Sequence, residues 1–161
     1  MNKGDPIPDV IVADEKGAVP LRTLLGGWAA VYFYPKDDTS GCTREAQDFT
    51  ALAREFEASG IQVIGISKDD PASHTRFAGR YDLRVRLLSD ESGTAAQAFG
   101  VWVEKSMYGR RYMGVERATF LFDAQGLLVQ EWRKVKVPGH AQAVLAAAKT
   151  GGGSTDGRPV R

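Results

Sequence analysis

The feature that most constrains the fold is a run of seven apolar or aromatic residues at positions 28–34. Gly26 and Gly27 precede this run and Pro35 follows it, which limits it to the length of a strand. A continuous apolar run of this length indicates a strand buried on both faces, as in the middle of a parallel sheet. A second run with the same character occupies residues 61–66.

The segments around these two strands predict an α/β fold. Residues 43–59 carry apolar side chains three and four positions apart, which indicates one amphipathic helix ended by Gly60. Asp70 is expected to cap a helix that runs to about residue 81. The other expected elements are strands at 10–12, 85–88 and 101–103, a helix at 93–99, a loop at 105–114, a hairpin of 115–122 with 127–132, and a helix at 138–149. This order favours a central mixed β-sheet flanked by helices.

Cys42 is the most informative polar position. It is the only cysteine in the sequence, so it cannot serve an intramolecular disulfide. It lies where the first helix should begin, and there free backbone N–H groups and the helix dipole favour an anion. A thiolate is the nucleophilic form of sulfur, so this position suits attack on an electrophile. The alternative is a buried cysteine that packs as a small hydrophobe, which fits the polar sequence around Cys42 less well.

Composition narrows the range of partners. A length of 161 residues fits one domain, since domains typically run to about 100–200 residues. The net charge of +1 gives no reason to expect nucleic acid or an anionic membrane as a partner. The first eight residues include an acid and two prolines instead of an apolar signal-peptide core, and no stretch approaches the ~20 apolar residues of a membrane span. With one cysteine, the expected location is cytoplasmic.

Two separated blocks of the sequence resemble the peroxiredoxin family. Residues 35–42, Pro-Lys-Asp-Asp-Thr-Ser-Gly-Cys, have the form Pro-x-x-x-Thr-x-x-Cys. Together with the flanking residues they are similar to the peroxiredoxin Q subgroup, also called bacterioferritin comigratory protein. A second block covers residues 108–122 and continues at 132–140. The resemblance spans residues 3–149 and implies a thioredoxin-like fold and thiol-dependent reduction of hydroperoxides.

The resemblance also implies roles for individual residues. Cys42 would be the peroxidatic nucleophile, which becomes a sulfenic acid as the peroxide is reduced. Thr39 would hydrogen-bond the peroxide, and Pro35 would shield the pocket from water. Arg117 would lie beside the sulfur, where its fixed charge stabilises negative charge as the O–O bond breaks. Taken alone, Thr39 also fits a helix cap and Pro35 a strand end.

Two supporting residues follow from the same resemblance. Glu45 matches the family position that helps to hold the arginine. The main-chain N–H groups of Gly41 and Cys42 are candidates for binding a peroxide oxygen. No cofactor and no metal ion are predicted, since one cysteine and two separated histidines make no ligand cluster.

One departure from the family pattern affects the catalytic cycle. Many relatives carry a second, resolving cysteine five residues after the first, where this sequence has Gln47, and others carry it in the helix that here spans residues 70–81. We therefore expect a one-cysteine enzyme recycled by thioredoxin, glutaredoxin or glutathione, as a monomer or weak homodimer. The alternative is a redox sensor or binding module that reacts once without sustained turnover. The absence of a Cys-x-x-Cys pair argues against a disulfide reductase.

The remaining polar features have simpler interpretations. His74 and His140 are not expected to be catalytic. The basic and aromatic stretch 105–112 is interpreted as a solvated loop near the active site, although a nucleic-acid patch is the alternative. Residues 1–150 are expected to form one thioredoxin-like domain, and the glycine-rich residues 151–161 a flexible tail.

Overall fold

The computed structural model describes residues 1–151. Its strands are β1 Ile11–Asp14, β2 Gly17–Pro20, β3 Trp28–Phe33, β4 Ile61–Ser67, β5 Arg86–Ser89, β6 Trp102–Met107, β7 Arg110–Val115, β8 Ala118–Phe122 and β9 Leu128–Trp132. Its helices are α1 Ser40–Ala51, α2 Ala53–Ala58, α3 Pro71–Tyr81, α4 Thr94–Ala98 and α5 His140–Gly151, with a 3-10 turn at Leu21–Leu24. The tail was expected at 151–161; Gly151 is the last residue of α5, and residues 152–161 lie outside the described residues.

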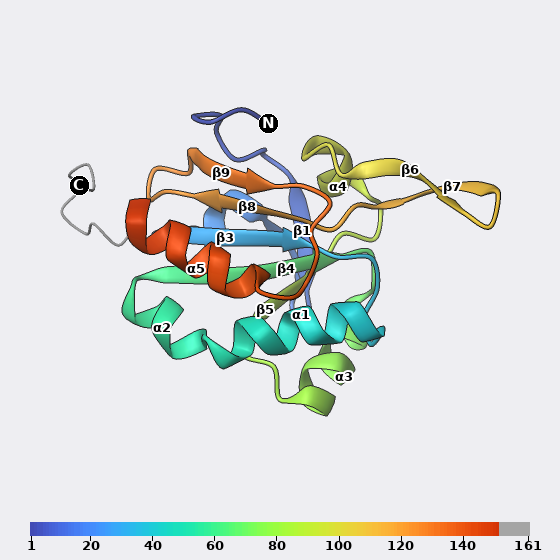
Figure 1. Ribbon diagram of the computed structural model, residues 1–161, viewed down its shortest axis with the longest axis horizontal. Coiled ribbons are helices and arrows are strands. Elements are labelled where there is room, and N and C mark those ends of the chain that lie inside the picture. Colours follow the sequence, from blue (N-terminus) through green and yellow to red (C-terminus); the bar gives the residue numbers. More distant parts are fainter. Residues whose placement is uncertain (152–161) are drawn as a thin grey trace.

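A seven-stranded mixed sheet forms the centre of the molecule (Figure 1). The strand order is β2-β1-β5-β4-β3-β8-β9, in which β3, β4 and β5 run parallel and the other pairings are antiparallel. The two apolar runs of the sequence form β3 and β4, which pair with each other in the middle of this sheet. Their carboxyl ends therefore lie together, and the loop that carries the cysteine begins there.

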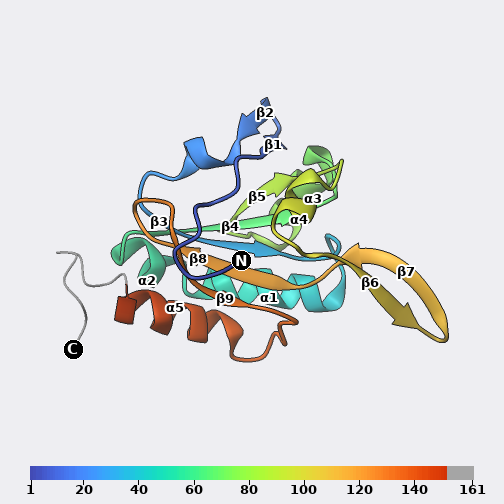
Figure 2. The same ribbon diagram turned by 90° about the horizontal axis from the view of Figure 1, so that it is seen from above.

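Each face of the sheet has its own apolar core, because side chains alternate along β3. Val31 and Phe33 face a cluster that includes Phe99 and Phe120. Ala30, Tyr32 and Tyr34 face the other cluster, where they meet apolar side chains of α1, α2, α3 and α5. Figure 2 shows α1, α2 and α5 on one side of the sheet and α4 on the other. The predicted mixed sheet flanked by helices is confirmed.

Two sequence-based predictions about the elements are wrong. The single helix expected at 43–59 is two helices, because Leu52 leaves helical geometry at φ −101° and ψ 9°. The apolar spacing continues through this break to Phe56, so periodicity did not reveal it. The loop expected at 105–114 is a hairpin of β6 and β7. Its side chains are mostly exposed, so it lacks the buried face that marks a strand in sequence.

Other predictions agree with the structure. Asp70 caps α3, where its carboxylate accepts a hydrogen bond from the Ser73 N–H at 2.8 Å. β8 and β9 form the expected hairpin around residues 123–126. None of the helices within residues 1–151 has the length and apolar character needed to cross a bilayer.

Candidate active site

The loop after β3 delivers Cys42 to the first turn of α1. Thr39 occupies the N-cap position with extended backbone, and Cys42 is the third residue of the helix. The backbone N–H groups of this turn lack partners within the helix, and the positive end of the helix dipole lies here. The Cys42 side chain is buried, since the residue is only 2% exposed.

Arg117 joins the cysteine to a carboxylate. It lies between β7 and β8, and its Nη2 donates a hydrogen bond to Cys42 Sγ at 3.4 Å. Its Nη1 donates to Glu45 Oε1 at 2.7 Å. Glu45 follows Cys42 by three residues on α1, so the two side chains lie on the same side of the helix. A Cβ atom on Gly41 would lie 3.2 Å from Arg117 Nη2, so the glycine leaves room for the guanidinium.

In this cluster, burial raises the pKa of Glu45 more than the charge of Arg117 lowers it. Burial raises the pKa of Glu45 to about 7, and the attraction of Arg117 offsets only part of that rise. Arg117 stays protonated, because Glu45 and Cys42 raise its pKa more than burial lowers it. Within residues 1–151, Glu45 Oε2 and the nearby Tyr32 hydroxyl are buried without a hydrogen-bond partner. Burial, followed by the charges of Glu45 and Cys42, raises the Tyr32 pKa, so this tyrosine stays neutral.

Thr39 and Pro35 border the loop but do not join the buried cluster. The Thr39 hydroxyl donates to the Lys36 carbonyl at 2.8 Å and makes no side-chain cap bond to α1. Thr39 therefore occupies the expected N-cap position, but its side chain does not make the hydrogen bond of a cap. Pro35 directly follows Tyr34, beyond the end of β3, and both Pro35 and Thr39 are exposed.

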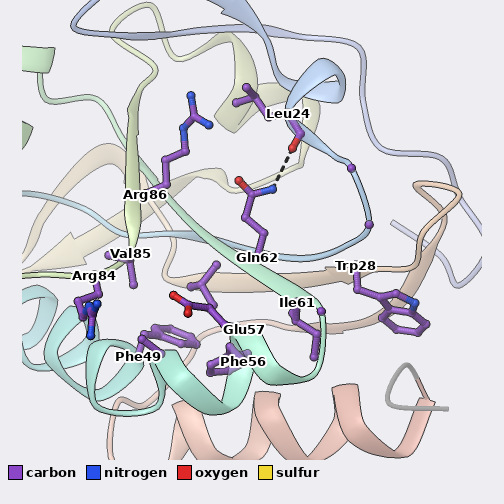
Figure 3. Close-up of a pocket in the computed structure, with 15 residues that line it drawn as sticks. Leu24, Trp28, Phe49, Phe56, Glu57, Ile61, Gln62, Arg84, Val85 and Arg86 are labelled. Carbon is purple, nitrogen blue, oxygen red and sulfur yellow. Dashed lines mark hydrogen bonds between the residues drawn. The ribbon is translucent and has the colours of Figure 1, made fainter. Parts of the chain in front are cut away.

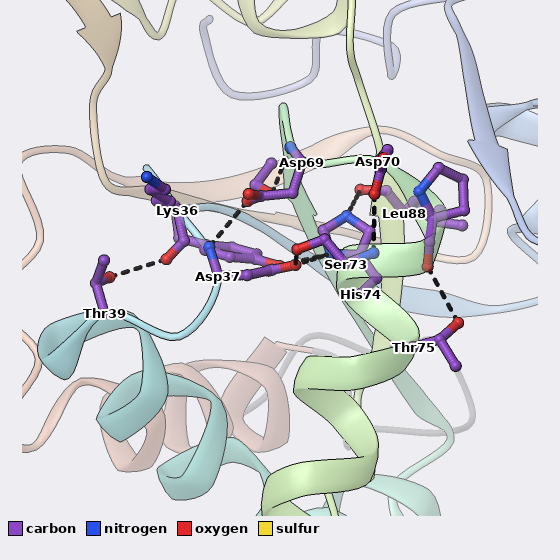
Figure 4. A network of polar contacts seen from close by, with 12 residues as sticks. Lys36, Asp37, Thr39, Asp69, Asp70, Ser73, His74, Thr75 and Leu88 are labelled. Carbon is purple, nitrogen blue, oxygen red and sulfur yellow. Dashed lines mark hydrogen bonds and ion pairs between the residues drawn. The ribbon is translucent and has the colours of Figure 1, made fainter.

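A second buried polar cluster holds the other end of the same loop (Figure 4). The Asp37 carboxylate accepts hydrogen bonds from the Tyr34 hydroxyl at 2.6 Å, the Ser73 hydroxyl at 2.8 Å and His74 Nδ1 at 2.7 Å. His74 Nε2 faces the Leu88 carbonyl at 3.0 Å. Although burial alone would raise the Asp37 pKa, the bonds from His74 and Tyr34 lower it. We call Tyr34, Asp37, Ser73 and His74 the Asp37 network.

Sequence reasoning missed the Asp37 network and the surroundings of His140. His74 is 4% exposed and contacts Asp37 in the loop between β3 and α1. His140 Nε2 lies 2.7 Å from the Thr119 hydroxyl. Burial and the positive charge of Arg117 lower the His140 pKa to about 4, so its ring is neutral near pH 7. The only sequence signal for either histidine is its position one turn from apolar helix residues.

A cavity of about 520 Å³ opens at the other end of the sheet (Figure 3). It lies where β3 and β4 begin, at Trp28 and Ile61, and Arg84 and Arg86 border it. Cys42 and Arg117 are not among its lining residues. Within residues 1–151 no three side chains of the metal-binding types gather at one point.

Comparison with known proteins identifies the family of this chain. Residues 3–131 match the AhpC/TSA family. The chain is 49% identical over 129 residues to peroxiredoxin Bcp of Xanthomonas campestris, which covers 80% of this chain and 81% of that protein. It is 41% identical over 147 residues to peroxiredoxin Bcp of Bacillus subtilis, covering 91% and 94%.

The solved structures agree with the sequence relatives. A structure of the X. campestris bacterioferritin comigratory protein superposes with a TM-score of 0.84 at 42% identity, covering 92% of this chain and 98% of that one. The thioredoxin-like fold implied by the resemblance is thereby confirmed. The chain therefore belongs to the AhpC/TSA family and is a peroxiredoxin of the Bcp, or peroxiredoxin Q, group with a single cysteine.

Proposed function

We propose that this peroxiredoxin reduces hydrogen peroxide and organic hydroperoxides through a sulfenic acid on Cys42, which an external thiol then reduces. The observation that carries the proposal is the contact of Arg117 Nη2 with Cys42 Sγ at 3.4 Å, in the first turn of α1, where Cys42 is buried. The fixed guanidinium charge and the helix dipole both favour the thiolate. The X. campestris relative was studied for alkyl peroxide reduction, which supports organic hydroperoxides as substrates.

The first step transfers two electrons from sulfur to the peroxide. The Cys42 thiolate attacks one peroxide oxygen, an S–O bond forms and the O–O bond breaks. The electron pair of that bond leaves on the second oxygen, which takes a proton and departs as water or an alcohol. Arg117 stabilises the negative charge that develops on this oxygen. Cys42 is left as a sulfenic acid.

The residues around the cysteine position the peroxide. Thr39 hydrogen-bonds the incoming peroxide once its hydroxyl turns away from the Lys36 carbonyl, and Pro35 limits the access of water to the sulfur. The N–H groups of Gly41 and Cys42 bind a peroxide oxygen. Glu45 holds Arg117 in place through the bond of 2.7 Å.

An external thiol completes the cycle, because the sequence contains one cysteine. The thiol attacks the sulfenic sulfur and releases water, which leaves a mixed disulfide on Cys42, and a second thiol then frees the cysteine. We propose thioredoxin, glutaredoxin or glutathione as the donor. The same proposal places an antioxidant enzyme in the cytoplasm, as a monomer or weak homodimer whose catalytic domain is residues 1–150.

Steady-state peroxide consumption by wild type and Cys42→Ser tests the proposal. Glutathione with glutaredoxin, and thioredoxin with its reductase, are supplied in parallel. We expect sustained turnover that Cys42→Ser abolishes. Full activity in Cys42→Ser would contradict the role of this residue. A single stoichiometric burst with every thiol would instead identify a redox sensor.

A further inference from the structure

The β6–β7 hairpin projects from the body of the protein beside the active site. It leaves the molecule at the end of the sheet where α1 begins, as both views show (Figures 1 and 2). β7 ends at Val115, and Arg117 follows two residues later. Six large apolar or aromatic side chains are exposed within residues 1–151, and four of them belong to this hairpin: Met107, Tyr108, Tyr112 and Met113. Met107 and Tyr112 lie on one face of the hairpin and Met113 on the other, so the exposed apolar side chains of one face, together with Tyr108 at the tip, offer a candidate interaction surface.

The tip of the hairpin has an unfavourable residue for its turn. Met107 pairs with Arg110, so Tyr108 and Gly109 form a two-residue turn, with φ angles of 53° and 79°. Turns with both φ angles positive favour Asn-Gly, and a bulky residue rarely adopts this conformation. Tyr108 is also 98% exposed, so no packing within the described chain compensates for the strain. Strain of this kind is found at binding and catalytic sites.

The two faces of the hairpin differ in charge. Cross-strand pairing places Lys105 opposite Tyr112 and Met107 opposite Arg110, and these four side chains share one face. We call them, with Tyr108 at the tip, the hairpin face. It carries two cations and no acid. The opposite face carries the acid Glu104, which lies 3.9 Å from Arg111.

Lys105, at the base of the hairpin face, lies near the active site. Burial and the positive charge of Arg117 lower the pKa of Lys105, whereas Cys42 acts on it in the opposite direction. Lys105 is therefore close enough to the site to respond to both groups. Gly114, beside Lys105, leaves room for this lysine, because a Cβ atom there would lie 3.2 Å from Lys105 Cδ.

The charge of the hairpin favours a partner other than a second copy of the chain. Residues 102–115 contain three basic residues and one acid, a net charge of +2, while the whole chain has +1. A symmetric dimer through the hairpin would bring two positive surfaces together. Because Cys42 is buried and the sequence holds no other thiol, a reductant has to dock at the rim of the site.

We propose that the hairpin face docks the protein that reduces Cys42: a dithiol protein whose contact face is acidic and partly apolar. This inference rests on the proposed peroxidase function and adds to it the surface that recognises the reductant. Tyr108 and Met107 supply apolar contact, and Arg110 supplies the charge that orients the partner.

Two substitutions remove this recognition without touching the catalytic cluster. Tyr108→Gly deletes the aromatic ring and suits the positive φ angle, so the turn is retained. Arg110→Glu reverses one charge on the hairpin face. Arg54→Glu is the matched control, because Arg54 is exposed and belongs to α2. Figure 1 shows α2 beyond the end of α1 that is farther from the hairpin.

The readout is kcat/KM for a reduced thioredoxin and for a reduced glutaredoxin, compared with turnover on dithiothreitol. We expect each hairpin variant to lower kcat/KM for the preferred protein about tenfold, mainly through KM. Turnover on dithiothreitol and the rate of sulfenate formation should stay at the wild-type level. Added salt should weaken wild type more than Arg110→Glu, since screening acts on the charge that the variant has lost.

Several results would overturn the docking surface. One is unchanged kcat/KM in both hairpin variants, and another is an equal loss in Arg54→Glu. A third is turnover on dithiothreitol with neither protein reductant active. A wild-type dimer in sedimentation that Tyr108→Gly dissociates would show that a second copy occupies the face. Absence of any Cys42 sulfenate after peroxide treatment would instead refute the peroxidase function itself.

Discussion

Two buried polar clusters hold the loop between β3 and α1, and they are built in opposite ways. The Asp37 carboxylate accepts three side-chain hydrogen bonds, and its pKa lies below the usual value. Glu45 bonds Arg117 through one oxygen, its other oxygen has no partner in the described part of the chain, and its pKa is raised to about 7. The satisfied cluster fixes the loop to α3. In the unsatisfied cluster, the Arg117 guanidinium keeps one N–H group directed at Cys42 Sγ.

This contrast indicates that the cluster around Cys42 is less stable than it would be if every polar atom had a partner. An unpaired buried polar atom costs about 1–3 kcal/mol, so such atoms persist where they serve a function. Arg117 directs Nη1 at Glu45 Oε1 and Nη2 at Cys42 Sγ, and Glu45 Oε2 is left without a partner within residues 1–151. The Asp37 network contains no reactive group and carries no such cost.

The largest effect is expected from breaking the satisfied cluster. His74→Ala leaves the Asp37 carboxylate buried with one fewer donor, and breaking a buried pair of this kind costs about 3–5 kcal/mol. Urea unfolding of wild type and variant measures the loss. Because His74 touches none of Cys42, Arg117 and Glu45, the rate of sulfenate formation should fall less than tenfold. A rate loss without a stability loss would show that the two clusters act as one unit.

Arg117→Ala should produce the reverse pattern. Losing one preorganised charge slows sulfenate formation by on the order of 100-fold to 1000-fold. Below pH 7 the loss of stability should be smaller than in His74→Ala, about 1–3 kcal/mol, because Glu45 left without its partner is protonated there and only an unpaired neutral group stays buried. Stopped-flow measurement of the reaction with peroxide tests the rate. Arg133→Ala is the matched control, since Arg133 makes a similar bond of 2.7 Å to Glu116 and its loss should leave the rate unchanged.

The two carboxylates should respond to pH in opposite directions. Glu45 has a raised folded pKa, so its contribution to stability is complete below its ordinary value of 4.5 and is lost as pH rises through about 7. Asp37 has a lowered pKa, so its contribution is present above its ordinary value of 3.8 and is lost as pH falls through the folded value.

Glu45→Gln isolates the first of these effects. As pH rises from 5 to 8, the free energy of unfolding of the variant relative to wild type should increase by on the order of 3 kcal/mol, at ~1.4 kcal/mol per unit of pKa shift. Urea unfolding at the two pH values measures the difference. A pH-independent difference between the proteins would show that Glu45 stays ionised throughout.

The grouping of Cys42, Arg117 and Glu45 could be predicted from the sequence far better than the Asp37 network. Cys42 follows from its position at a helix start, and Arg117 and Glu45 follow from the family resemblance alone. The contact of Asp37 with His74 was missed, because the two residues are 37 positions apart and each is an ordinary polar residue in its own segment. The β6–β7 hairpin was missed because exposed strands have no buried face for a pattern to reveal.

The smallest effect is expected at Gly41, where one substitution should change stability and the rate of sulfenate formation in opposite directions. Gly41 lies in the first turn of α1, where alanine is the better helix former by up to ~1 kcal/mol. The new Cβ would lie 3.2 Å from Arg117 Nη2, the atom that bonds Cys42 Sγ at 3.4 Å. The flexible guanidinium can yield by a few tenths of an ångström, but only by moving relative to the sulfur.

Gly41→Ala should therefore raise the free energy of unfolding slightly while slowing sulfenate formation about threefold to tenfold, since small misplacements of a catalytic charge are costly. Unfolding and stopped-flow measurements on one preparation give both numbers. Gly79→Ala is the control, because it lies in α3 with open space around it and should gain stability without losing rate. An unchanged rate in Gly41→Ala would mean that the guanidinium tolerates displacement and that its charge, more than its exact position, serves the reaction.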